Sequence, residues 1–225
     1  MRMMKRWLRS GFILPAAAAC ILSVPIGAQA ALVTYSFTGN LNPDVDPLSM
    51  FPVSGSFQFD NATGGSGGAY PAVKNFVVTI GGYSSHFAPG ANAITISHNT
   101  DLGGGVLGDR WSVVSAATGP VVTAGTPPVS YTPFSFDLQL NRVGGGLFTN
   151  TNLQDPPSLN GLNGVTGRWR LFFEGLNGTT VYYLGSVTSL TAVPLPAAVL
   201  LFGAGLISLV GLGAGGLRNL RGTQS

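Results

Sequence analysis

Carboxylates are the side chains of this sequence that come nearest to a hydrolytic centre. Glycoside hydrolysis uses two carboxyl groups on opposite sides of the scissile bond. Glu174 is the only glutamate and stands at the end of an expected strand, and Asp109 or Asp137 could lie opposite it. The serines lack the nucleophile-elbow pattern of a catalytic triad. We therefore expect Glu174 to be a solvated strand-end residue, the protein not to be an enzyme, and a secreted hydrolase to be the weaker alternative.

Histidine and aspartate supply the possible metal ligands. His86 and His98 are the only histidines, and neither has a partner at the spacing of a zinc site. Calcium needs a cluster of oxygen ligands, and the nearest candidates are Asp44 with Asp46 and the segment 101–109. Neither has the pattern of a calcium loop. We expect no metal or other cofactor, and a calcium site assembled from separate loops is the alternative.

Aromatic and arginine side chains could bind carbohydrate. Sugar rings stack on aromatic faces, but most aromatics of a one-sided sheet belong to its core. Arg168 and Arg170 flank Trp169 and should point to the opposite face of their strand, where they could meet an acidic polysaccharide or form an ordinary solvated surface. The aromatic candidates are Tyr70, Tyr83, Trp111, Tyr131, Trp169 and Tyr182.

The elements that must position these side chains are strands. Hydrophobic and polar residues alternate in many short segments that Gly, Pro and Asn clusters separate, and no long amphipathic helical segment occurs between them. We predict an all-β domain over residues 31–192, with eight or nine strands arranged as a β-sandwich or jelly roll. The expected strands are 34–38, 53–60, 75–80, 93–97, 110–115, 134–140, 168–173 and 181–190.

The alternation also predicts a core. In the segment 134–140 it places Phe134, Phe136, Leu138 and Leu140 inside and Ser135, Asp137 and Gln139 in water. The two glycine-rich segments 64–68 and 103–105 are expected to be connections, and 116–133, with four prolines, a long surface loop. The expected core comprises Phe37, Phe57, Phe59, Phe76, Val78, Ile80, Ile94, Ile96, Trp111, Val113, Phe136, Leu138, Leu140, Trp169, Leu171, Phe173 and Val187.

Positive charge is concentrated at the two ends of the chain. The 225-residue sequence has a net charge of +3, but six of its eleven lysines and arginines lie in the first nine or the last eight residues. Residues 31–193 hold five basic and eight acidic residues, a net charge of −3. Since nucleic-acid binding depends on a basic surface, we expect no nucleic-acid partner.

The first 30 residues predict a secretory signal peptide. Four basic residues precede an apolar stretch, and Ala28 and Ala30 give the small-residue pattern for cleavage before Ala31. An uncleaved anchor is one alternative, although two prolines interrupt the apolar stretch. A lipoprotein signal with Cys20, the only cysteine, as the lipidated residue is another.

The C-terminal segment predicts a membrane span. Residues 197–217 carry no charge and would form a helix about 31 Å long, which matches a bilayer core. Arg218 and Arg221 follow at once and would stop transfer, facing the cytoplasm. Before the span, Pro194 and Pro196 hold the chain extended, as a processing enzyme requires. A plain anchor with helix-starting prolines is the alternative.

Residues 193–221, with Val193-Pro194-Leu195-Pro196, a glycine-rich apolar span and a short arginine tail, resemble the PEP-CTERM sorting signal in its VPLP form. Leu195 stands where the named triplet has glutamate. The resemblance implies recognition of Val193, Pro194 and Pro196 by exosortase, a membrane transpeptidase. It also implies export to the envelope surface or extracellular matrix of a Gram-negative, exopolysaccharide-forming bacterium, the setting of a biofilm. We therefore expect a non-enzymatic exported protein, with an exopolysaccharide-binding module as the alternative.

Overall fold

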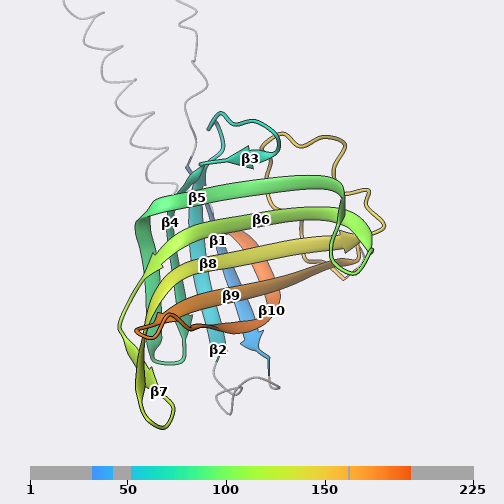
Figure 1. Ribbon diagram of the computed structural model, residues 1–225. Helices are drawn as coiled ribbons and strands as arrows, with labels where there is room; N and C mark the ends of the chain where they lie inside the picture. Colours follow the sequence, from blue (N-terminus) through green and yellow to red (C-terminus); the bar gives the residue numbers. More distant parts are fainter. Residues whose placement is uncertain (1–31, 43–51, 162, 194–225) are drawn as a thin grey trace, which may run out of the picture.

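The computed structural model describes residues 32–42, 52–161 and 163–193, and strands make up all of their regular secondary structure (Figure 1). The all-β prediction is confirmed. The strands are β1 (Leu32–Leu41), β2 (Pro52–Asp60), β3 (Ala69–Tyr70), β4 (Val73–Ile80), β5 (Tyr83–Asp101), β6 (Leu107–Thr118), β7 (Val122–Ala124), β8 (Val129–Val143), β9 (Val165–Gly175) and β10 (Thr180–Val193).

Eight of these strands form a closed antiparallel barrel. Their hydrogen-bonded order is β5–β4–β2–β1–β10–β9–β8–β6, and β6 pairs with β5 to complete the ring. β3 adds to β5, and β7 pairs with β8. The expected sandwich or jelly roll, which requires two sheets with edges, is therefore not confirmed. Closure leaves the ring without an unpaired edge.

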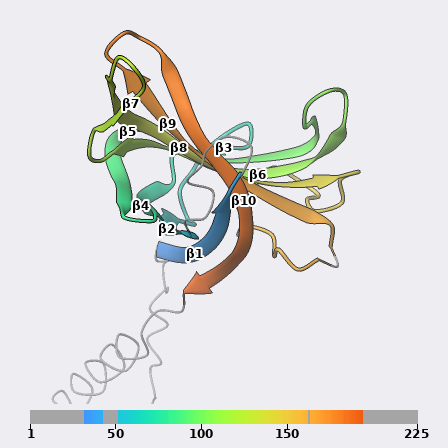
Figure 2. The same cartoon turned by 90° about the horizontal axis from the view of Figure 1, so that it is seen from below.

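Bends in the long strands allow the ring to close. The β5–β6 register breaks between Phe87 and Asn92, a stretch that contains Gly90 with a φ of 152°. The β8–β9 register breaks between Pro133 and Ser135. Such breaks bend a strand and re-aim the side chains that follow. Figure 1 shows β6, β8 and β9 side by side, crossing in front of β1 and β2, and Figure 2 shows β10 running beside β1.

The segment 116–133 was predicted to be a long surface loop, and that prediction is wrong. β6 continues to Thr118, β7 covers Val122–Ala124, and β8 begins at Val129. β7 and the start of β8 form a hairpin with Val122 opposite Tyr131. Two of the four prolines, Pro127 and Pro128, occupy the turn of this hairpin, where no ladder hydrogen bond is lost.

All seventeen residues of the predicted core are buried. Aromatic rings form its centre: Phe136 stacks on Phe76 and Phe37 at centroid distances of 4.9 and 6.0 Å, and Trp111 packs against Phe57. Further buried residues were not in the predicted set: Tyr35 lies within β1, and most of the others lie at strand ends or in loops. They are Tyr35, Leu41, Val53, Tyr70, Ala72, Val73, Ala117, Phe148 and Val165.

The predicted alternation fails at the start of β8. Phe134 is 41% exposed, because the irregularity between Pro133 and Ser135 turns it outward and Pro133 takes the inward place. Asp137 and Gln139 point to the outer face as predicted but are only 5% and 8% exposed. The side chains of two arginines on β9 cover them, so these positions do not simply face water.

The two buried tryptophans of the barrel differ in hydrogen bonding. The indole N–H of Trp111 donates to the Gln154 carbonyl at 3.0 Å, whereas that of Trp169 has no partner within the described residues. We expect Trp111→Phe to lower the free energy of unfolding by about 1 kcal/mol more than Trp169→Phe, because only the first leaves a carbonyl unpaired. Urea unfolding of both variants measures the difference, and equal losses would contradict it.

The terminal signals lie outside the described residues, except for Val193, the last residue of β10. This holds for Ala28, Ala30, Ala31, Pro194, Pro196, the span 197–217, Arg218 and Arg221, and also for Asp44 and Asp46. Within the part of the chain that the structure describes, no helix has the length and hydropathy needed to cross a membrane.

Candidate functional site

A polar surface crosses β6, β8 and β9 on the outside of the barrel. Because Trp169 and Leu138 point into the core, their neighbours along each strand point outward. Strand pairing then places outward side chains opposite one another. We call three pairs the polar ladder: Asp137–Arg170, Gln139–Arg168 and Asn141–Arg110.

The first pair of the ladder is an ion pair. Arg170 on β9 donates from Nε to both carboxylate oxygens of Asp137 on β8, at 3.1 and 3.0 Å, and its Nη2 also contacts Oδ2. Asp137 is 7% exposed at its side chain, so the guanidinium shields the carboxylate from water. This forked geometry fixes the plane of the Arg170 side chain and neutralises its charge.

The other two pairs join an arginine to a neutral amide. Arg168 donates from Nε and Nη2 to the Gln139 side-chain oxygen at 3.1 and 2.8 Å. Arg110 on β6 donates from Nε to the Asn141 side-chain oxygen at 2.9 Å and from Nη2 to the Leu102 carbonyl at 3.2 Å. An amide oxygen orients a guanidinium without cancelling its charge, so both arginines keep a full positive charge.

The positive charges of the ladder act on one another. The pKa of Arg110 is lowered by burial and then by the charges of Arg168 and Arg170, while Asp137 and Asp101 oppose this effect. Like charges disfavour the charged form of a neighbour when they are close. Arg168 and Arg170 therefore add to the effect of burial on Arg110, and the two aspartates reduce it.

An aromatic row continues the ladder along the same face. Phe134, Phe172 and Tyr182 come from β8, β9 and β10, with centroid distances of 6.1 Å from Phe172 to Phe134 and 5.6 Å to Tyr182. Phe134 and Tyr182 are 41% and 46% exposed. The guanidinium of Arg170 lies 4.9 Å from the Phe172 ring centroid, which joins the row to the ladder.

A separate carboxylate, Asp109, is fully buried at the start of β6. It accepts hydrogen bonds from the backbone N–H groups of Asn99, Leu147 and Phe148 at 2.9, 2.7 and 3.0 Å, and its Oδ1 lies 2.9 Å from His98 Nδ1. Burial acts to raise the pKa of Asp109, but these N–H groups and His98 lower it by more, so it lies below the ordinary value. Asp109 ties the 144–148 turn to β5 and is a structural residue.

The carboxylates considered for hydrolysis are not brought together. Glu174 is exposed and faces Thr132 and Thr180 across its strand, Asp137 is paired with Arg170, and Asp109 is enclosed by backbone donors. Asp101 caps a turn by accepting from the Gly103 N–H at 2.7 Å. Among the residues with described positions, no three His, Cys, Asp or Glu side chains group together as metal ligands would.

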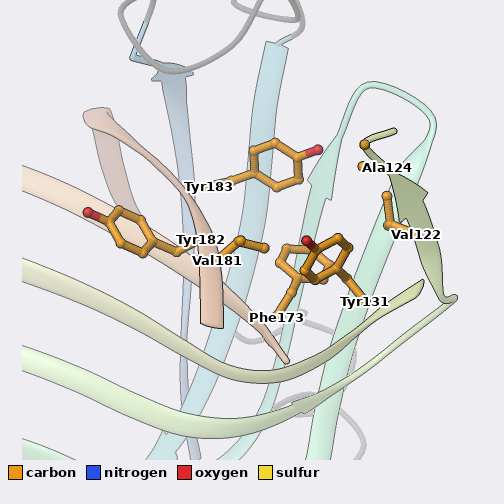
Figure 3. A pocket seen from close by; sticks show the side chains of 8 residues that line it. Val122, Ala124, Tyr131, Phe173, Val181, Tyr182 and Tyr183 are labelled. Atoms are coloured by element: carbon orange, nitrogen blue, oxygen red, sulfur yellow. The ribbon is translucent and has the colours of Figure 1, made fainter. Parts of the chain in front are cut away.

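A pocket of about 350 Å³ lies beside the β7–β8 hairpin (Figure 3). Its lining residues carry no charged side chain. Tyr183 packs edge-on against Phe173 at 5.5 Å, and Tyr83 also contacts Phe173. Burial, and then Tyr183, raise the pKa of Tyr83 to about 12, so its hydroxyl stays neutral at physiological pH. The pocket suits an apolar group and offers no acid or base.

The structure separates the sequence candidates for carbohydrate binding. Tyr70, Trp111 and Trp169 are core residues, whereas Tyr182 is exposed. Tyr83 and Tyr131 are half-buried, and His86 is exposed. Arg168 and Arg170 lie on the outer face opposite Trp169, as predicted.

Several members of this surface were missed in the sequence. Arg110, Gln139, Asn141 and Phe172 join it through strand pairing between segments about 30 residues apart. In the sequence, residues two apart in the strands 134–140 and 168–173 point to the same outward face, and this pattern could have indicated a shared surface.

Comparison with protein-family models, with curated proteins and with solved structures finds no match.

Proposed function

We propose that the protein is a non-enzymatic component of the cell envelope surface or extracellular matrix of a Gram-negative bacterium, exported and processed by an exosortase. The VPLP segment followed by the glycine-rich span and arginine tail is the observation that carries this proposal. The N-terminal signal-peptide pattern supports export. The membrane-anchored precursor would be a temporary form of the protein.

The barrel itself supports a binding or structural role. Its buried carboxylate Asp109 is used to join loops, and Asp137 is used to hold Arg170. Glu174 is exposed, and threonines, not carboxylates, lie opposite it on both neighbouring strands. An exposed face with ordered arginines and aromatics suits contact with a polymer more than it suits turnover.

The mass of the C-terminal peptide of the mature protein, isolated from its native host, tests the sorting proposal. We expect truncation near residues 193–196 and recovery of the protein in the envelope or culture matrix fractions. Replacing Pro194 and Pro196 with alanine should leave the full-length precursor in the inner membrane. A mature chain that ends at Ser225 in the wild-type host would contradict the proposal and indicate a conventional anchor.

Carbohydrate binding on the outer face is a second candidate function. The aromatic row carries it, because Phe134 and Tyr182 present exposed rings on either side of the half-buried Phe172, next to ordered polar side chains. Sugar rings have an apolar face that packs on aromatic rings and hydroxyl groups that hydrogen-bond at its edges. An exopolysaccharide of the matrix would be the natural partner.

Removing the middle ring of the row should weaken glycan binding. We expect Phe172→Ala to reduce the affinity of the processed protein for a bound glycan by about 3–10-fold, the usual worth of one aromatic contact. Leu32→Ala, which changes an exposed apolar residue of β1, serves as the matched control. Glycan-array screening followed by calorimetry gives the measurement, and an array with no binding glycan would reject this second function.

A further inference from the structure

We propose that the polar ladder binds the carboxylate groups of an acidic, uronate-containing polysaccharide, with Arg110 and Arg168 as the ligand-binding residues. This inference rests on the carbohydrate-binding function proposed above and names its ligand class. It assigns different roles to the three arginines: Arg170 is neutralised by Asp137, whereas Arg110 and Arg168 keep charges for a ligand.

The first argument is uncompensated charge. Among the described residues Arg170 and Asp137 form an ion pair and His98 contacts Asp109, and neither contact includes Arg110 or Arg168. The neutral amides Asn141 and Gln139 occupy the positions where carboxylates would cancel these charges. Since residues 31–193 carry a net charge of −3, the positive ladder is a local feature and not part of a generally basic surface.

The second argument is preorganisation. Gln139 takes the Nε and Nη2 donors of Arg168, while the Arg168 Nη1 has no hydrogen-bond partner among the described residues. Gln139 is 8% exposed and therefore held in place by its surroundings. A guanidinium fixed in this way binds a carboxylate with little further loss of side-chain entropy.

The third argument is mutual repulsion. Burial, and then the charges of Arg168 and Arg170, lower the pKa of Arg110, while Asp137 and Asp101 act in the opposite direction and do not cancel the shift. An anion placed between Arg110 and Arg168 would relieve this repulsion as well as accept hydrogen bonds. This repulsion favours a ligand that places a negative group near Arg110 and Arg168. It does not require a negative group near the aromatic row.

The shape of the surface favours an acidic polysaccharide over a small anion. Phe172 and Thr166 are six residues apart on β9, which corresponds to about 20 Å along the strand. Thr166 pairs with Asn141, so this length reaches from the aromatic row to the far end of the ladder. The aromatic row occupies one end, and Arg110 and Arg168, which belong to no ion pair among the described residues, occupy the other. A linear polymer with sugar rings and one carboxylate per residue matches both parts, whereas a small anion uses only the arginines.

The test compares polygalacturonate with the same polymer after methyl esterification, by calorimetry on the processed protein. We expect esterification to weaken binding by about tenfold or more, because it removes the charge and leaves the rings. Arg110→Gln with Arg168→Gln should weaken polygalacturonate binding by a similar factor and abolish most of its salt dependence. Arg142→Gln is the control, since Arg142 donates to the Gly146 carbonyl and lies outside the ladder.

The outcomes separate this inference from the function on which it rests. Equal binding of the two polymers, or unchanged binding by the double variant, overturns the charge recognition and leaves carbohydrate binding intact. Absence of binding to both polymers and to every arrayed glycan overturns both. If the double variant fails to fold, as thermal unfolding would reveal, the esterification comparison on the wild type still decides. Equally tight binding of polyphosphate would overturn selectivity for a polysaccharide.

Discussion

Replacing Asp109 with alanine is expected to lower the free energy of unfolding by about 3–5 kcal/mol, the usual cost of removing one partner from a buried charged cluster. The carboxylate is fully buried and accepts hydrogen bonds from three backbone N–H groups, on Asn99, Leu147 and Phe148. Its loss leaves all three donors unpaired in the interior, together with the ring of His98. Urea unfolding followed by tryptophan fluorescence measures the change.

Asp101→Ala is the matched control for Asp109→Ala. Asp101 also accepts a backbone hydrogen bond, from Gly103, but it is exposed at the end of β5, so we expect a loss of about 1 kcal/mol or less. Similar losses for the two variants would show that burial of Asp109 does not contribute as argued.

The pH dependence of stability gives a second readout on Asp109. Its pKa is lowered in the folded protein, so its stabilising contribution is complete above the unfolded-state pKa of about 3.9. That contribution is lost as the pH falls below this value and through the lower folded-state pKa. We expect the wild type to lose more stability than Asp109→Asn between pH 5 and pH 2, and parallel curves would contradict the argument.

The second large effect is expected at Phe136. Phe136→Ala should lower the free energy of unfolding by about 3–5 kcal/mol, because the ring is fully buried and its removal leaves a cavity in the core. Phe76 and Phe37 lose their stacking partner at the same time. Chemical unfolding again gives the measurement.

Phe134→Ala tests the same strand two residues earlier. The sequence pattern treats the two phenylalanines alike, but Phe134 is 41% exposed. We expect its replacement to cost about 1 kcal/mol or less, mainly through the lost contact with Phe172. Equal losses at the two positions would mean that Phe134 belongs to the core and that β8 has no bulge.

This pair of residues illustrates what the sequence can predict about the fold. Alternation predicted β8 and the buried side chains of its regular part, because a pleated strand fixes which face each residue occupies. The outward turn of Phe134 depends on how β8 meets β9 near Pro133, which no local pattern encodes. Ring closure is likewise missed, since it depends on the pairing of β5 with β6.

The candidate site, like the fold, could be predicted from the sequence only in part. Arg168 and Arg170 could be placed on the outer face from their positions on either side of Trp169. Arg110 could not be joined to them, since it reaches the ladder through β8, by the pairing of Asn141 with both Arg110 and Thr166. The β8 side chains that pair with the arginines are set by this long-range register, and they decide which arginine charges are cancelled. The sequence therefore indicated basic residues but not which of them stay outside an ion pair and can bind a ligand.

The pairing of β1 with β10 has a consequence for how the protein is made. Thr34 lies opposite Val193, so β1, the first of the described strands to be synthesised, must wait for β10, the last of them. Until then β1 and β9 each expose an open edge that another chain could pair with. A ring with such a non-local seam folds slowly and only after synthesis of the whole domain. The export proposed above would therefore depend on keeping the chain unfolded until β10 has crossed the membrane, and we expect a product that stops short of β10 to aggregate.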